Sequence, residues 1–231
     1  MFSTKTKIIN MKLNVTIIKF PEISLKTRDA QKLRGFFGNL FREYSEILHN
    51  HYADGSVKYS YPLVQYKVIE NIPHLAGIEQ GGKLLMELFL RIKHLNIEGN
   101  KYPVNSKNIT NTITEIQDFG KLRTYRFNTL WMGLNQQNYQ KYIQMHDTSE
   151  KNEFLNRQIC NSIMAFYKGI GYTVKDRIMA TGNLREKSVR FKDRKMLAFD
   201  GSFVTNACLP DYVGIGKAVS RGFGTIIREK S

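Results

Sequence analysis

MKLNVTIIKF, residues 11–20, decides the fold class together with the pattern that follows it. This stretch is rich in β-branched residues and roughly alternates between apolar and polar side chains, which predicts a strand. From Asp29 to Leu48 apolar residues recur at helical spacing, which predicts an amphipathic helix. Residues 58–69, KYSYPLVQYKVI, alternate again, and residues 74–78 can form a neighbouring strand, with Pro62 favouring a sheet edge or a bulge. The chain therefore opens in the order strand, helix, strand, strand.

A second amphipathic segment follows these strands. Gly81 and Gly82 precede an apolar stripe from Leu84 to Leu95, which is typical of a helix. A strand within residues 96–104 would then complete a βαββαβ unit, the ferredoxin-like arrangement. The polar Asn/Thr/Lys stretch at residues 105–114 is therefore the expected linker to a second domain.

The second half repeats the order of the first more loosely. Residues 121–134 are expected to form a strand, and residues 135–168 a helical region that ends at Gly169 and Gly171. Further strands are expected at residues 172–180, 188–191, 196–204 and 225–228. We therefore predict an α+β protein with two tandem ferredoxin-like (RRM-like, βαββαβ) domains, residues 11–110 and residues 111–231.

The chain is strongly basic, with 35 Lys and Arg against 20 Asp and Glu, a formal net charge of +15 and a pI near 9.7. This excess predicts a polyanionic partner, either nucleic acid or an anionic membrane surface. No apolar run is long enough to span a membrane and the first ten residues lack a secretory core, so a cytoplasmic protein is expected. Cys160 and Cys208 indicate neither a disulfide framework nor a zinc site.

The triplet His49-Asn50-His51 is the main candidate for catalysis. Side chains two residues apart point to the same side of an extended backbone, so both imidazoles can face one substrate. Histidine titrates near neutrality, and the pair can therefore supply a base and an acid. A surface role is the ordinary interpretation of such a pair. The neighbours that favour function are aromatic or basic: Tyr52, Lys58, Tyr59 and Tyr61.

Metal and nucleotide chemistry are not expected. The zinc hydrolase pattern HxHxDH fails because Ala53 and Asp54 stand where Asp and His are required. A dinucleotide-binding GxGxxG would need glycine at Val219, and no Gly-Lys pair is followed by Ser or Thr. We therefore expect neither a metal ion nor another cofactor.

The run GIGKAVSRGFG, residues 214–224, is the main candidate for phosphate binding and is called the glycine-rich run below. Its glycines permit backbone N–H groups to approach a phosphate, and its other polar residues add charge and a donor. The residues assigned to this contact are Gly214, Gly216, Lys217, Ser220, Arg221, Gly222 and Gly224. The alternative is a glycine-rich hairpin without a ligand.

Basic residues are also concentrated between Lys168 and Lys195, where nine stand against three acidic residues. A solvated face is the common explanation of such a run. Its one-sided charge and the interleaved Tyr172 and Phe191 favour contact with RNA phosphates and bases. The residues expected to bind RNA here are Arg185, Lys187, Arg190, Lys192 and Arg194.

GIGKAVSRGFG resembles the glycine-rich loop of the RAMP superfamily of CRISPR-associated proteins. LRGFFGNLF, HNHYADGSVKYSYPLVQYK and IPHLAGIEQGGKLL are similar to the N-terminal domain of its repeat-cleaving endoribonucleases from type I systems. The resemblance spans most of residues 11–228. It implies two ferredoxin-like domains and metal-independent cleavage of precursor CRISPR RNA within repeats, with 5′-hydroxyl and 2′,3′-cyclic phosphate ends.

The resemblance also implies residue roles and partners. The family places its general base, a His, just after the first helix, which matches His49 or His51; we favour His51. Tyr59 and Lys58 are the nearest candidates for the Tyr and Lys that some members add. The implied partners are CRISPR repeat RNA, precursor and processed, and CRISPR effector subunits, with the chain a monomer or homodimer and no membrane. The alternative is a noncatalytic RAMP subunit that binds guide RNA.

Overall fold

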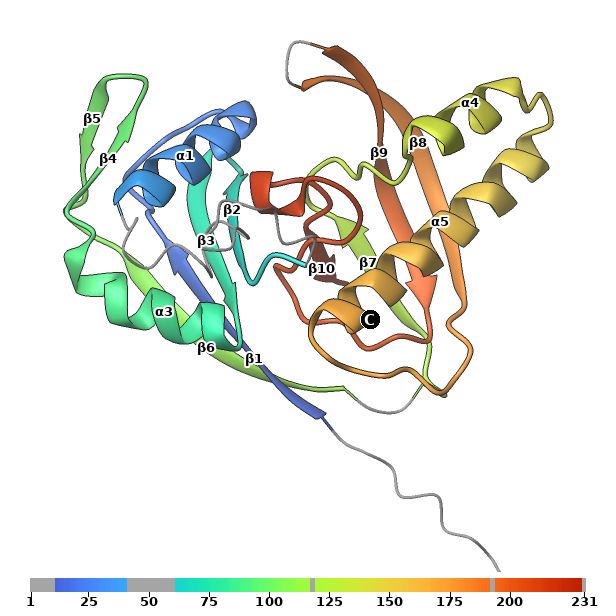
Figure 1. Ribbon diagram of the computed structural model, residues 1–231, viewed down its shortest axis with the longest axis horizontal. Helices are drawn as coiled ribbons and strands as arrows, with labels where there is room; N and C mark the ends of the chain where they lie inside the picture. The colour runs from blue at the N-terminus through green and yellow to red at the C-terminus, as the bar shows by residue number, and fades with distance from the viewer. Residues whose placement is uncertain (1–10, 41–60, 117–118, 192–193, 230–231) are drawn as a thin grey trace, which may run out of the picture.

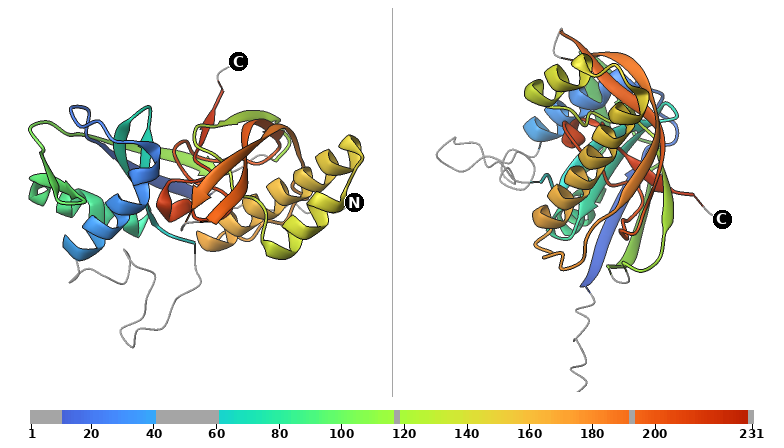
Figure 2. Two further views of the ribbon diagram at one scale, coloured as in Figure 1. Left: turned by 90° about the horizontal axis from the view of Figure 1, so that it is seen from above. Right: turned by 90° about the vertical axis from the view of Figure 1, so that its right-hand side faces the viewer.

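The structure, a computed structural model, describes residues 11–40, 61–116, 119–191 and 194–229. Two four-stranded antiparallel sheets form two units that lie side by side, the first in blue to green and the second in yellow to red (Figure 1). In the views of Figure 2 the helices gather toward one side of the molecule and the strands toward the other. The predicted α+β class with two ferredoxin-like domains is confirmed.

The N-terminal unit has the strand order β2-β3-β1-β6, with helices α1 and α3 on one face. Its elements are β1 (Met11–Lys19), α1 (Ala30–Leu40), β2 (Val64–Ile69), β3 (Ile72–Ile78), α3 (Gln80–Leu88) and β6 (Asn108–Ile116). Short 3₁₀ helices, η1 (Thr27–Asp29) and η3 (Phe89–Arg91), precede α1 and follow α3. Pro62 precedes β2, which is an edge strand of this sheet.

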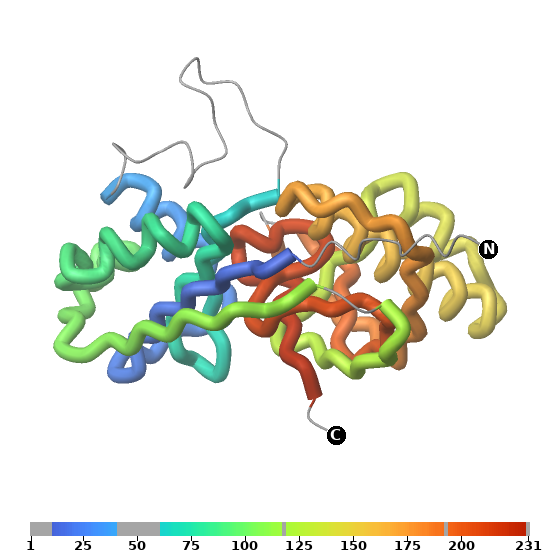
Figure 3. The backbone as a smooth tube through the Cα atoms, turned by 90° about the horizontal axis from the view of Figure 1, so that it is seen from below, coloured from blue at the N-terminus to red at the C-terminus, as the bar shows by residue number. Residues whose placement is uncertain are grey.

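The expected linker at residues 105–114 is wrong, because β6 occupies it. β6 pairs with β1 from Met11↔Ile116 to Lys19↔Asn108 and therefore continues past the expected boundary at residue 110. Figure 3 shows the two strands side by side. The predicted fourth strand at residues 96–104 instead forms a separate hairpin of β4 (His94–Ile97) and β5 (Asn100–Pro103). Most β6 side chains are exposed, so the strand lacks the apolar alternation that would have revealed it.

The C-terminal unit has the strand order β10-β7-β9-β8. Its elements are β7 (Arg123–Phe127), α4 (Gln136–Gln144), α5 (Thr148–Gly169), β8 (Ala180–Phe191), β9 (Arg194–Thr205) and β10 (Ile226–Arg228). If the strands of each unit are numbered along the chain, both sheets have the spatial order fourth, first, third, second. In the ferredoxin-like pattern, the connection between the third and fourth strands carries a second helix. Within the described residues of this unit, that connection holds only the 3₁₀ helix η4 (Val219–Arg221).

One other expectation for this half is wrong. The strand expected at residues 172–180 is irregular up to Met179, because side chains rather than a ladder satisfy its backbone. Asn206 binds the Met179 N–H and the Arg177 carbonyl, and Thr205 donates to the Met179 carbonyl. The helical region predicted at residues 135–168 is confirmed, and it consists of two helices, each with its own N-cap side chain, Asn135 for α4 and Asp147 for α5.

The two units share a buried core. On the face of the N-terminal sheet opposite α1 and α3, Val15 and Ile17 of β1 and Ile78 of β3 join the apolar cluster that contains Phe166 of α5 and Ile215 of the glycine-rich run. Because the sheet is covered on both faces, successive residues of β1 from Val15 to Ile18 are all buried. The junction between the units is therefore a packed interior.

Candidate nucleic-acid interface

The glycine-rich run lies in this junction, between α1, β2 and the C-terminal sheet (Figure 1). At Gly222, where φ is +91°, an added Cβ would lie 2.8 Å from the Ala30 Cβ and 3.1 Å from the Tyr66 carbonyl oxygen. Glycine is required there by both the backbone conformation and the close contact. The N-terminal unit therefore determines the course of the run.

Three of the four glycine N–H groups expected to approach a phosphate are bonded inside the protein. Gly214 donates to Gln65 Oε1 (2.9 Å), Gly222 to the Val219 carbonyl (3.2 Å) and Gly224 to the Leu130 carbonyl (2.9 Å). The predicted use of these N–H groups is therefore wrong. Of the side chains in the run, that of Lys217 is exposed, whereas those of Ile215 and Val219 are buried.

A buried polar network anchors the run to β2. The Tyr61 hydroxyl donates to the Gly214 carbonyl (2.6 Å) and accepts from Gln65 Nε2 (2.7 Å). Lys67 Nζ donates to Gln65 Oε1 (2.9 Å) and Thr225 Oγ1 (3.0 Å). Burial raises the pKa of Tyr61, which keeps its hydroxyl protonated. Burial also lowers the pKa of Lys67 to about 7.

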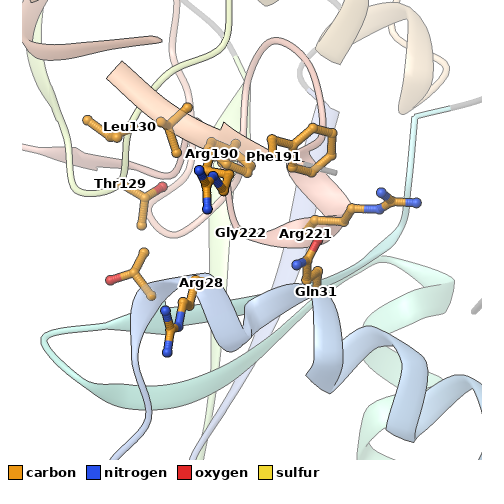
Figure 4. Close-up of a pocket in the computed structure, with 11 residues that line it drawn as sticks. Arg28, Gln31, Thr129, Leu130, Arg190, Phe191, Arg221 and Gly222 are labelled. Carbon is orange, nitrogen blue, oxygen red and sulfur yellow. The ribbon is translucent and has the colours of Figure 1, made fainter. Parts of the chain in front are cut away.

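Beside this network, arginines from both units surround a cavity of about 160 Å³ (Figure 4). Arg28 comes from η1, Arg190 from β8 and Arg221 from η4. Burial lowers the pKa of Arg221, and the positive charge of Arg34 on α1 lowers it further. Cations gathered in this way from distant parts of the chain attract a polyanion.

These four arginines lack carboxylate partners in the described part of the chain. None of the ion pairs formed there includes Arg28, Arg34, Arg190 or Arg221. Asp29, which follows Arg28, pairs instead with Lys32 at 2.7 Å. Among the described residues, therefore, no carboxylate neutralises the charge of these arginines.

The basic residues expected to bind RNA do not share one surface. Arg190, Arg221 and Gly222 line the cavity, whereas Arg194 and Lys217 line a hollow beside α4. Arg185 and Lys187 lie elsewhere on the β8–β9 ribbon, at 2.8 Å and 3.4 Å from the carboxylate of Asp200. Ser220 belongs to η4, Gly216 adjoins Trp131, and Lys192 lies outside the described residues.

Both halves of the chain match known family domains. Residues 11–115 match the Cas6b N-terminal domain, and residues 118–229 match the Cas6b C-terminal domain. The chain belongs to the Cas6b family. The two matches meet where β6 ends, so the family division follows the division into two sheets.

Individual Cas6b relatives agree with this assignment. A crystal structure of Cas6b has a TM-score of 0.89 at 35% identity, and covers 95% of this chain and 100% of that one. A crystal structure of the CRISPR RNA processing endoribonuclease Cas6b has a TM-score of 0.76 at 31% identity, with the same coverage. An uncharacterized protein of Methanocaldococcus jannaschii is 33% identical over 144 residues, which are 62% of this chain and 97% of that protein.

The catalytic candidates of this Cas6b chain, His49, His51 and Tyr59, lie outside the described residues, as does Lys58. Arg28, Arg34, Gln65 and Lys67 could not be identified from the sequence. Polar residues that alternate along a strand indicate a solvated face, so nothing in the sequence marked Gln65 and Lys67 as buried. Arg28 stands just before a predicted helix, where its charge alone was the available signal.

Other ionisable groups of the Cas6b chain have structural partners. His74 is buried, with Nδ1 at 2.8 Å from the Ile72 carbonyl oxygen and its ring stacked on Tyr212. The Cys160 thiol donates to the Ile178 carbonyl (3.7 Å) and the Cys208 thiol to the Glu115 carbonyl (3.4 Å). Across the described ranges, no group of three or more His, Cys, Asp or Glu residues lies close enough to hold a metal ion. No helix in those ranges is both long and apolar enough to cross a membrane.

Proposed function

We propose that this Cas6b chain is a metal-independent endoribonuclease that cleaves precursor CRISPR RNA within its repeats. Membership of the family and the likeness to a CRISPR RNA processing endoribonuclease support the substrate class. The observation that carries RNA binding is the cluster of arginines around the cavity, which lacks carboxylate partners among the described residues. RNA phosphates are the anions that such a cluster would bind.

The reaction follows from the chemistry of ribose. A 2′-hydroxyl becomes a nucleophile when a base takes its proton, and it attacks the adjacent phosphodiester when the attacking and leaving oxygens are in line. The products are a 2′,3′-cyclic phosphate and a 5′-hydroxyl. Binding of the RNA backbone by the arginines and by Lys217 would hold the strand in that geometry.

We assign the proton transfers to the histidine pair. His51 accepts the 2′ proton and His49 protonates the leaving 5′ oxygen, with the reverse assignment as the alternative. Lys58 stabilises the charge that develops on the phosphoryl group, because three of the four glycine N–H groups are already bonded. Tyr59 is the remaining candidate for this site.

The partners that follow are the repeat in its precursor form and the processed CRISPR RNA. Processed RNA that stays bound would carry the chain into a CRISPR effector complex. The chain acts as a monomer or a homodimer in this proposal.

The test is cleavage of end-labelled CRISPR repeat RNA by the purified protein in chelator. We expect one cleavage site, products with a 5′-hydroxyl and a cyclic phosphate, and loss of cleavage in His51→Ala and His49→Ala. A repeat with a single 2′-deoxyribose at the cleavage site is the matched control and should bind without being cut. Tight binding with no cleavage, unchanged in both variants, would leave the noncatalytic guide-RNA subunit as the function.

A further inference from the structure

The cavity at the junction has the size of a single ring. Its volume is about 160 Å³, and a protein cavity of about 150 Å³ accommodates one benzene molecule. Residues far apart in the sequence form it: the start of α1, the segment before Trp131, the end of β8 and the end of η4. The cavity is therefore too small for stacked nucleotides but large enough for one planar group.

One wall of the cavity is apolar and aromatic. The rings of Phe191 and Phe223 meet edge to face, with centroids 5.4 Å apart and an interplanar angle of 86°. Leu130 and Val189 extend this wall. The guanidinium of Arg221 lies 5.4 Å from the Phe191 ring centroid. Unstacked RNA bases bind to such aromatic rings and arginine planes.

The rim of the cavity is polar and positive. Figure 4 shows Arg28 and Gln31 on the η1–α1 segment, with Gln31 beside Arg221 and the Arg28 guanidinium pointing away from Arg190. The Gln31 amide is exposed, and it can both donate to and accept from the edge of a base. Thr129 is already engaged, because its hydroxyl oxygen accepts from the Thr225 N–H. Apolar walls with cations at the rim suit a nucleotide, whose base is flat and whose phosphates are anionic.

We propose that this cavity binds one unpaired base of the RNA, stacked on Phe191, with its edge on Gln31 and the flanking phosphates on Arg28 and Arg190. The subsite rests on the proposed function, since the strand that supplies the base is the CRISPR repeat. It adds recognition of a single nucleotide to a surface that otherwise binds the phosphate backbone.

The test combines RNA lacking one base with protein lacking one ring. A series of repeat RNAs, each with one abasic position and a 2′-deoxyribose at the cleavage site, is titrated against the wild-type protein and Phe191→Leu. Leucine keeps apolar bulk at position 191 and removes the ring. At one position we expect base removal to weaken binding to the wild-type protein about tenfold and to have little further effect on Phe191→Leu.

Two matched variants separate stacking from folding. Phe191→Tyr keeps the ring and should restore the abasic penalty at the same position. Phe89→Leu makes the same change in a half-buried phenylalanine of η3, away from the cavity, and should retain the wild-type penalty. Thermal unfolding of each variant verifies that the fold is intact.

The outcomes distinguish this subsite from the proposed function. A wild-type protein that cleaves the repeat but shows no abasic position coupled to Phe191 overturns the subsite and leaves the endoribonuclease. If the protein binds the repeat and shows the coupling but does not cleave, the subsite is supported and the catalytic proposal is overturned. Absence of repeat binding overturns both.

Discussion

Lys67 Nζ lies 3.0 Å from the hydroxyl oxygen of Thr225, a contact that joins strand β2 of one unit to the residue directly after the glycine-rich run in the other. Both side chains are buried. Loss of hydration disfavours the charged ammonium and lowers the pKa of Lys67 to about 7. The junction between the two units therefore contains an amine that titrates near physiological pH.

Lys67→Met should flatten the dependence of stability on pH above neutrality. Between pH 7 and pH 10.5 the unfolded chain binds a proton at this lysine that the folded chain has lost, so the wild-type protein gains stability as pH rises. The contribution to the slope is up to about 1.4 kcal/mol per pH unit. Urea unfolding at pH 7.5 and 9.5 measures it. The exposed Lys101→Met is the control, and equal slopes in both variants would contradict the prediction.

His74→Phe should make the protein less sensitive to acid. Burial lowers the pKa of His74 to about 4. The positive charges of Lys19 and Lys67 also lower this pKa, whereas the hydrogen bond to the Ile72 carbonyl raises it. Between pH 6.5 and pH 4 the unfolded chain therefore binds the extra proton, and stability falls as pH falls. Phenylalanine can keep the stack on Tyr212 and has no proton to gain.

The measurement for His74 is the free energy of unfolding in urea at pH 7 and at pH 4.5. The wild-type protein should lose more stability between these values than His74→Phe does. His146→Phe, at an exposed position between α4 and α5, should behave as the wild type. A loss of equal size in all three proteins would refute the role of His74.

Gly222→Ala should destabilise the fold and weaken RNA binding. The residue has a φ of +91° and its Cβ would lie 2.8 Å from that of Ala30, so strain adds to a clash, at a cost of about 1–3 kcal/mol. Gly171→Ala is the matched control, because Gly171 also has a positive φ, +77°, but no neighbour within 4 Å. In urea unfolding, Gly171→Ala should lose less free energy of unfolding than Gly222→Ala. In RNA titration, Gly171→Ala should bind as the wild type does.

Arg190→Gln and Arg221→Gln should each reduce the salt dependence of RNA binding. Loss of one phosphate contact to a single strand lowers the slope of log affinity against log salt by about 0.7. Arg185→Gln should change the slope less, because Asp200 already pairs with the Arg185 guanidinium at 2.8 Å. Binding isotherms over a series of salt concentrations measure the slopes. A larger change for Arg185 would place the RNA on the ribbon face instead.

The sequence was sufficient for the fold where one face of an element is apolar and the other polar. β1, α1 and α3 follow from such patterns, and so does the order of the first five elements. β6 does not, because its side chains are mostly exposed and its pairing with β1 satisfies only the backbone. The strand prediction for residues 172–179 is wrong for the opposite reason, since side chains distant in sequence bind the backbone of this segment.

The candidate site could be predicted in part. Charge and glycine content identified Arg190, Arg221 and Gly222, and these residues do line the cavity. The sequence placed Arg185 and Lys187 with them because it cannot show which face of a twisted ribbon a residue occupies, or that Asp200 lies opposite. It treated Tyr61 as a neighbour of the histidines, whereas its hydroxyl binds the Gly214 carbonyl across the junction.

The two sheets have the same strand order, yet they connect their third and fourth strands differently. The N-terminal unit uses α3 and a hairpin, whereas the C-terminal unit uses the glycine-rich run and the single turn η4. A full helix on the second sheet would have closed that unit on itself. The shortened connection leaves it incomplete, so the first unit supplies the missing cover with β2 and α1. The departure from internal symmetry thus creates a surface that neither half could form alone.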